Sequence, residues 1–171
     1  MRFKSLKLQT LRDLYLAELR DLYSAEKQLT RALPQMVEAA KTHDLKEAFA
    51  NHMRETEGHV ARLESIFNAL DEKPTGEACE AMKGLLDEAE MFIEADGNHE
   101  VIDAALVSAA QRVEHYEMSG YGTARTLAMQ LGNADAAELL QATLDEEKNA
   151  NEKLTMIAES EVNAMAAHAV A

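Results

Sequence analysis

Glutamate side chains occur on the apolar faces of several expected helices, where a carboxylate would be removed from water. When residues are placed at 100° steps, Glu26 falls between Leu22 and Leu29, and Glu147 falls close to Leu144. An unpaired carboxylate in such a place loses its solvation or takes up a proton, so it needs a compensating partner. The residues that share this inward placement, or flank it, are Glu26, His52, Glu55, His59, Glu114, Glu117 and Glu147.

The spacing of these residues along the chain places them at one level of a helical bundle. Glu26 lies 17 residues before the first expected turn, at residue 43, and His59 lies 16 residues after it. Glu117 and Glu147 each lie 15 residues from the second turn, at Gly132. If both turns lay at the same end of the bundle, a rise of about 1.5 Å per residue would place all four roughly 22–26 Å from that end. We therefore predict that they meet in one layer.

A repeat in the sequence indicates two related half-sites. Glu26 precedes Glu55 by 29 residues and Glu117 precedes Glu147 by 30, and four residues further on come His59 and Asn151. Several carboxylates in one dry layer repel each other, and two divalent cations would resolve that conflict. Carboxylate oxygens with an imidazole suit iron or manganese, and zinc also accepts them. We expect two divalent metal ions, with iron as the first choice and manganese or zinc as alternatives.

Simpler interpretations of single residues stay open. One inward glutamate can pair with a Lys or Arg at the edge of the core, and a histidine on an apolar stripe can be an ordinary packed residue. The usual motif in such sites is Glu-x-x-His, at i and i+3. Here Gly58 stands at i+3 from Glu55 and His59 at i+4, so His52 competes with His59 as the ligand from this helix. Tyr121 is interpreted as a packing residue, with a hydrogen bond to a ligand or a role in handling a radical as the alternatives.

The elements that would position these residues are long helices. A chain of 171 residues favours a single domain, over residues 1–171, and its richness in alanine, leucine and glutamate favours helix. Pro34 should kink the first helix or break it. Asp44 and Thr75 are candidate N-caps. We expect helices at about 7–42, 45–71, 77–95, 100–131 and 134–164, with residues 165–171 frayed.

The order of these elements is a hairpin, a long connection and a second hairpin. Residues 72–98 form a connection that carries its own short helix. A single long crossover between two hairpins is the ferritin-like variant of the four-helix bundle. The predicted fold class is therefore all-α: a ferritin-like antiparallel four-helix bundle with a long crossover that carries an additional short helix.

Charge and composition exclude several classes of function. The net charge of −14 argues against a nucleic-acid partner and against binding to an anionic membrane. A single cysteine, Cys79, excludes a disulfide framework and a thiolate metal cluster within the chain. Neither a signal-peptide pattern nor a membrane-spanning run is recognisable, so we expect a soluble cytoplasmic protein.

Four ordered segments resemble the YciF/YciE family of ferritin-like bacterial stress proteins. They are LYSAEKQL at 22–29, ETEGHV at 55–60, VEHYE at 113–117 with YGT at 121–123, and LDEEK at 144–148. The resemblance implies a rubrerythrin-like bundle and a homodimer. It implies as metal ligands Glu26, Glu55, Glu114, Glu117 and Glu147, with His59. The chain departs from the rubrerythrin pattern in having Asn151 where a histidine would complete the second half-site, and in lacking cysteine pairs for a rubredoxin domain.

These observations lead to one leading functional hypothesis and two alternatives. The leading one is a diiron or dimanganese stress protein that reacts with peroxide or oxygen, or that oxidises Fe(II), as a peroxidase, catalase or ferroxidase does. The second is a non-catalytic structural or interaction dimer whose metal site only stabilises the bundle. The third is a storage-type assembly, which would require a closed cage.

Overall fold

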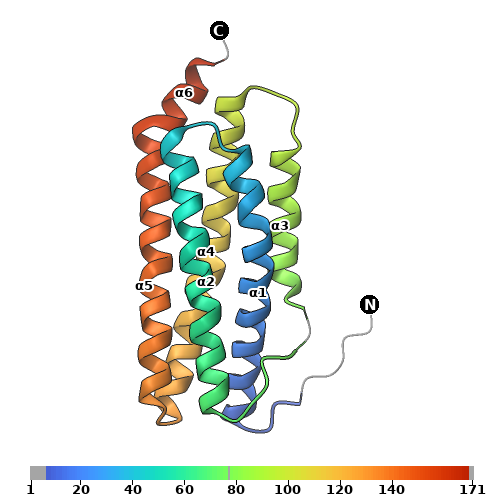
Figure 1. Cartoon of the computed structure of the whole chain (residues 1–171), viewed down its shortest axis with the longest axis vertical. Coiled ribbons are helices and arrows are strands. Elements are labelled where there is room, and N and C mark those ends of the chain that lie inside the picture. Colours follow the sequence, from blue (N-terminus) through green and yellow to red (C-terminus); the bar gives the residue numbers. More distant parts are fainter. Residues whose placement is uncertain (1–6, 77, 170–171) are drawn as a thin grey trace.

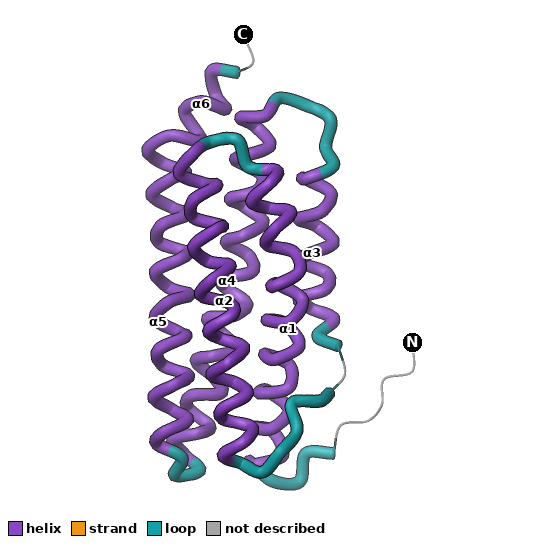
Figure 2. The backbone as a smooth tube through the Cα atoms, in the orientation of Figure 1, coloured by secondary structure: helices purple, strands orange, loops and turns teal. Residues whose placement is uncertain are grey.

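The computed structural model describes residues 7–76 and 78–169, and the ordered elements among these residues are all helices (Figure 2). The elements are α1 (Leu11–Ala39), α2 (His43–Ala69), α3 (Glu80–Ile93), α4 (His99–Gln130), α5 (Ala134–Ile157), a π-helical turn (Ala158–Val162) and α6 (Asn163–His168). None of the described helices is both long enough and apolar enough to cross a bilayer.

The four long helices form an antiparallel bundle with the fifth on its outside. Helix α1 pairs with α2, and α4 pairs with α5 (Figure 1). The crossover leaves the lower end of α2, continues through α3, which packs against α1 and α4, and enters α4 at the upper end. This is the ferritin-like architecture with a helix in the crossover, as expected from the sequence.

The two tight turns lie at opposite ends of the bundle, and not at the same end as the predicted layer required. The turn between α1 and α2 is at the top of Figure 1 and the turn between α4 and α5 is at the bottom. The long helices contain 24 to 32 residues, so at about 1.5 Å per residue they are roughly 36–48 Å long. A level 22–26 Å from one end is then also near the middle counted from the other. The predicted layer of Glu26, His59, Glu117 and Glu147 therefore still forms, because residues near the middle of each helix meet whichever end the turns occupy.

Local capping explains where the helices begin. Helix α1 begins at Leu11 rather than near residue 7 because Thr10 and Asp13 form a reciprocal capping box. Helix α3 begins at Glu80, three residues later than predicted, because Cys79 rather than Thr75 is its N-cap. Residue 77, the predicted first residue of that helix, lies outside the described residues.

The turn between α1 and α2 is held by a buried carboxylate from a distant helix. Asp103 of α4 accepts hydrogen bonds from the backbone N–H groups of Lys41 at 2.9 Å and Thr42 at 2.7 Å. Helix α2 therefore begins at His43, and Asp44 lies within its first turn instead of capping it. Pro34 is accommodated without a break, since α1 continues to Ala39.

From the end of α4 onward, the chain remains helical further towards its C-terminus than predicted. Gly132, with φ of +76°, follows the end of α4 at the predicted turn, and Asn133 caps α5. The chain then continues through the π-helical turn into α6 as far as His168, where fraying from residue 165 was expected. Residues 170 and 171 lie outside the described part.

The buried apolar residues form two main clusters on either side of the central layer. The lower core, towards the turn between α4 and α5, contains bulky side chains such as Tyr15, Phe67 and Tyr121. The upper core, towards the turn between α1 and α2, is rich in alanine. Its members include Ala40, Ala48, Ala89, Ala109, Ala110 and Ala158. The two halves of the bundle thus differ in the size of the side chains that fill them.

Candidate metal centre

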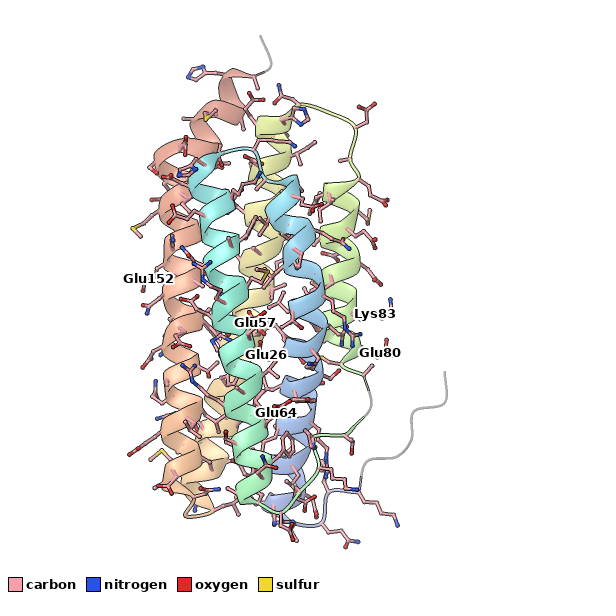
Figure 3. All side chains as sticks on the ribbon, in the orientation of Figure 1. Glu26, Glu57, Glu64, Glu80, Lys83 and Glu152 are labelled. Carbon is pink, nitrogen blue, oxygen red and sulfur yellow. The ribbon has the colours of Figure 1, made fainter. Side chains whose placement is uncertain are left out.

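A group of carboxylates and imidazoles is buried at mid-height between α1, α2, α4 and α5. Glu26 lies inside the bundle, whereas Glu57 and Glu64 lie on its exposed surface (Figure 3). The members of the buried group are Glu26, His52, His59, Glu114, Glu117 and Glu147. The predicted meeting of Glu26, His59, Glu117 and Glu147 in one layer is therefore what the structure contains.

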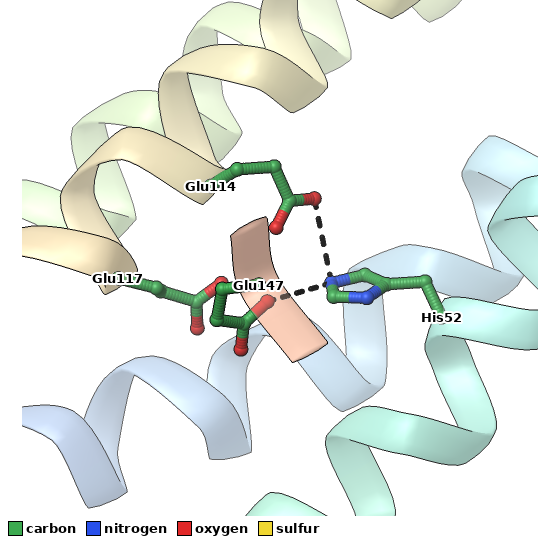
Figure 4. A group of neighbouring side chains, drawn as sticks. All are labelled: His52, Glu114, Glu117 and Glu147. Carbon is green, nitrogen blue, oxygen red and sulfur yellow. Dashed lines mark ion pairs between the residues drawn. The ribbon is translucent and has the colours of Figure 1, made fainter. Parts of the chain in front are cut away.

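The six side chains divide into two sets that share Glu147. The first set, which we call the closed half-site, consists of Glu26, His59 and Glu147. The second, which we call the open half-site, consists of His52, Glu114, Glu117 and Glu147 (Figure 4). Within each set, one potential ligand atom from every residue lies within 4.8 Å of the others. A carboxylate common to both sets is the arrangement that a bridging ligand requires.

The closed half-site is built around the His59 ring. Its Nδ1 lies 2.9 Å from Glu147 Oε1 and 3.3 Å from Glu26 Oε1, while its Nε2 lies 2.9 Å from Glu146 Oε2. Arg62 in turn holds Glu146, with Nη2 2.8 Å from Oε1. A proton on Nε2 directed at Glu146 leaves the Nδ1 lone pair directed inward, which is how outer carboxylates orient metal-binding histidines.

Tyr121 supports the closed half-site from the other side. Its hydroxyl donates to Glu26 Oε1 within the buried interior. This is the hydrogen-bonding alternative that the sequence left open beside simple packing. The hydroxyl fixes one carboxylate oxygen of Glu26 and leaves Oε2 without a hydrogen bond.

The open half-site is more loosely held. His52 Nε2 lies 3.4 Å from Glu114 Oε1 and 3.8 Å from Glu147 Oε2, and its Nδ1 lies 3.5 Å from Glu55 Oε2. His52 thus repeats the inward and outward arrangement of His59 with the two ring nitrogens exchanged. Its outer carboxylate has no arginine corresponding to Arg62 among the described ion pairs.

Glu55 lies outside the buried group. Its side chain is 46% exposed and its carboxylate is on the outer side of His52. The sequence left open whether His52 or His59 is the ligand from this helix. The structure buries both, and their separation of seven residues places them two turns apart on one face of α2.

Burial and mutual proximity shift the pKa values of the group strongly. Burial raises the pKa values of Glu114 and Glu117 well above their usual range. Burial alone would lower the pKa of His59, but the carboxylates of Glu147 and Glu26 raise it to about 11. Burial opposes protonation of His52 in the same way, and Glu114 is the main group that raises its pKa to about 9. Without a metal ion, the interior therefore retains protons on its imidazoles and on its most deeply buried carboxyl groups.

The polar atoms of this group are not satisfied by the protein itself. Fourteen buried side-chain nitrogen and oxygen atoms of the described residues lack a hydrogen bond, and nine of them belong to these six residues. They include both carboxylate oxygens of Glu117 and of Glu147. Buried polar atoms normally have partners, so a dense cluster without them indicates a missing ligand. Hard carboxylate oxygens with two imidazoles fit divalent iron, manganese or zinc.

A cavity of about 370 Å³ borders the open half-site. His52 and Glu114 form part of its wall, and most of the remainder is apolar, from the upper core and from a smaller cluster beside α3. The lining also includes the exposed residues Arg54, Glu55 and Asn149, so the cavity reaches the surface between α2 and α5. The His59 ring does not line this cavity, which distinguishes the two half-sites.

Sequence reasoning did not assign a role to the outer residues of the site. On a helical wheel Glu146 lies about a right angle from Glu147, nearer the edge of the stripe, and the apolar pattern alone does not mark Arg62. Arg62 follows His59 by three residues and therefore shares its face of α2, which is a signal that could have been used. The contact between Glu146 and His59 joins α5 to α2, and that pairing depends on how the helices pack.

Comparison with known proteins gives consistent matches over most of the chain. The family described as a domain of unknown function (DUF892) matches residues 10–167. Protein YciF of Escherichia coli (strain K12) is 45% identical over 159 residues, which cover 92% of this chain and 96% of YciF. The crystal structure of this E. coli stress protein has a TM-score of 0.88, at 46% identity over 91% of this chain and 99% of that one. A Rhodopseudomonas palustris protein described as a putative structural protein has a TM-score of 0.86, at 44% identity over 91% and 99%.

Proposed function

The chain belongs to the DUF892 family and is a homologue of the stress protein YciF, and on this basis we propose that it is a dinuclear metal protein of the stress response. The two ions would be iron, with manganese or zinc as alternatives, and they would react with peroxide or oxygen or oxidise Fe(II). The ligands would be Glu26, His59 and Glu147 on one side and His52, Glu114, Glu117 and Glu147 on the other. Glu55, implied as a ligand by the family resemblance, would reach the site only by turning inward from its exposed position.

When bound, such a pair of ions supplies Lewis-acid polarisation and a change of oxidation state. The protein contributes the fixed charges and the order of the site. Glu146 accepts the proton of His59 Nε2 and Arg62 holds Glu146, so the imidazole keeps one tautomer. Tyr121 immobilises one oxygen of Glu26. Glu26, His59 and Tyr121 are fully buried, and the low dielectric there strengthens the hydrogen bond between Tyr121 and Glu26.

The main support for a reactive function is that small molecules can reach the open half-site through the cavity. A purely structural metal site has its coordination completed by protein and needs no route for small molecules. Here His52 and Glu114 form the wall of a cavity that reaches the surface, so a small oxidant can approach this side. Glu55, beside His52 Nδ1 and exposed to solvent, is placed to exchange a proton with that ring.

A structural role is the alternative, and one comparison favours it. The R. palustris homologue is described as a putative structural protein. In that case the ions would only bind the four helices together, and metal would stabilise the fold without turnover. The homodimer implied by the family resemblance and the cytoplasmic location expected from the sequence remain predictions.

Metal content and reactivity test the proposal together. We expect about two ions per chain after loading with Fe(II) or Mn(II), and consumption of peroxide or oxygen by the loaded protein. Glu26→Ala and Glu117→Ala should each reduce metal content, while Glu152→Gln, an exposed change on α5, should not. Two ions without any reaction would favour the structural alternative. Full metal content in both alanine variants would show that the ligands are assigned wrongly.

A further inference from the structure

The cavity beside the open half-site has the size and lining of a binding site for an organic molecule. Its volume of about 370 Å³ lies within the range of small-molecule sites. The interior wall is made by apolar side chains from different helices, among them Leu33, Met36, Phe49 and Leu154. A peroxide or oxygen molecule needs only a small part of this space. The remaining volume, which has apolar walls, therefore fits a larger apolar molecule.

The charges at the mouth of the cavity are unlike those of the rest of the molecule. The chain carries a net charge of −14, yet Arg54 of α2, which is exposed, and Lys153 of α5, which is partly exposed, both belong to the lining of the cavity. Arg54 donates to the neutral side chain of Asn51, and within the described part of the chain neither cation forms an ion pair. Glu55 is the acidic residue at this mouth, and its carboxylate faces His52.

From this combination we propose that the cavity binds an aliphatic monocarboxylate, with its chain among the apolar residues and its carboxylate at Arg54 and Lys153. Arg54 and Lys153, with the side-chain amides of Asn51 and Asn149 in the same lining, offer several donors to a carboxylate. A water molecule occupies about 30 Å³, so the cavity holds the volume of roughly twelve waters or a chain on the order of ten carbons.

The buried end of the cavity is the less favourable place for the head group. Four carboxylates of the metal centre, those of Glu26, Glu114, Glu117 and Glu147, balance the four positive charges of two divalent ions. A fifth carboxylate there would add an unbalanced buried charge. This orientation rests on the proposed function, whereas the shape and the charges of the mouth do not. The chain of the ligand would then pass over His52 and Glu114 and narrow the route to the open half-site.

Calorimetric titration of the full-length protein tests the proposal, first without metal and then loaded with Mn(II). The probes are decanoate, octanoate, decanol and decylammonium, each below its micellar concentration. Decanoate should bind about tenfold or more tightly than octanoate, since each buried methylene contributes about fourfold. Decanol should bind at least tenfold more weakly than decanoate, and decylammonium more weakly still. Absence of binding by decanoate in both forms, or equal binding of the anion and the cation, would overturn the proposal.

Matched variants locate the two ends of the ligand. Arg54→Gln with Lys153→Gln should weaken decanoate binding at least tenfold and leave decanol binding unchanged, because only the anion uses the cations. Lys148→Gln, an exposed change on the same helix as Lys153, should have no effect. Ala110→Leu, which places a larger side chain in the wall, should weaken both ligands.

The two forms of the protein separate this proposal from the metal proposal. Binding of decanoate by the metal-free protein supports the cavity site even if no metal ever binds. Binding that requires Mn(II) and persists in the variant lacking both cations would place the head group on the metal and overturn the orientation proposed. Unchanged binding in Ala110→Leu would show that the ligand lies elsewhere.

Discussion

The two half-sites share a helix, a bridging carboxylate and a pattern of contacts, but they differ in how firmly they are held. His59 is directed by Glu146, which Arg62 holds, and the bulky lower core with Tyr121 lies next to it. His52 faces exposed Glu55 and a cavity in the alanine-rich upper core. The closed half-site therefore holds its ligands in fixed positions, whereas the open half-site can be reached by small molecules.

The largest effect is expected at the residue that belongs to both sides. Glu147→Gln should abolish binding of both ions, whereas Glu26→Gln and Glu117→Gln should each affect one half-site first. At a metal concentration 100 times Kd, each bound ion should add about 2.7 kcal/mol to the unfolding free energy of the wild type, and Glu147→Gln should lose this gain. Metal analysis and denaturant unfolding with and without Mn(II) measure both effects. Retention of two ions by Glu147→Gln would show that the half-sites do not share it.

The second prediction concerns pH: the metal-free protein should lose stability as pH rises, whereas the loaded protein should not. The folded pKa values of His52, at about 9, and His59, at about 11, lie above the ordinary value near 6.5. A raised folded pKa contributes stability that is fully present below the unfolded pKa and is lost as pH rises through the folded one. The raised pKa values of Glu114 and Glu117 act in the same direction.

Metal-free protein should therefore lose stability as pH rises from about 6 to 10. Metal binding must displace those protons, so affinity should rise about tenfold per pH unit for each proton displaced, and the loaded protein should gain stability over the lower part of the range. Thermal unfolding against pH, with and without Mn(II), gives both slopes, and calorimetry in buffers of different ionisation enthalpy counts the protons. Parallel slopes would contradict the charge assignments of the group.

The third prediction compares the outer carboxylates of the two histidines. Glu146→Ala removes the partner that fixes the His59 tautomer and should weaken metal binding about 10–100-fold. Glu55→Ala removes an exposed carboxylate 3.5 Å from His52 and should weaken it less than about tenfold. Titration with Mn(II) followed by calorimetry measures both. Equal losses would mean that the open half-site is held as firmly as the closed one, and a larger loss for Glu55→Ala would indicate that Glu55 itself becomes a ligand.

The sequence was sufficient to predict the helices, their order and the inward glutamates, because these depend on periodicity within one helix. It could not place the two turns at opposite ends, since spacing along the chain is the same for either arrangement. The position of Glu55 shows the limit of a helical wheel. The wheel places Glu55 beside His52 and His59, but how far α2 turns towards its neighbours determines that Glu55 faces solvent. The pairing of Glu146 with His59 and of Asp103 with the first turn likewise arises only from packing between helices.

The smallest predicted effect tests the packing that separates the two sides. Ala110 borders the cavity in the upper core, and Ala128 is fully buried in the lower core, both on α4. Ala128→Leu should cost about 1–3 kcal/mol of unfolding free energy, because added methylenes in a filled core force side chains from their preferred rotamers. Ala110→Leu adds the same atoms where the cavity can receive them, so its cost should stay below about 1 kcal/mol. Denaturant unfolding of the metal-free proteins compares the two directly. Equal costs would mean that the upper core is as tightly packed as the lower, and the open half-site would then lose the space that distinguishes it.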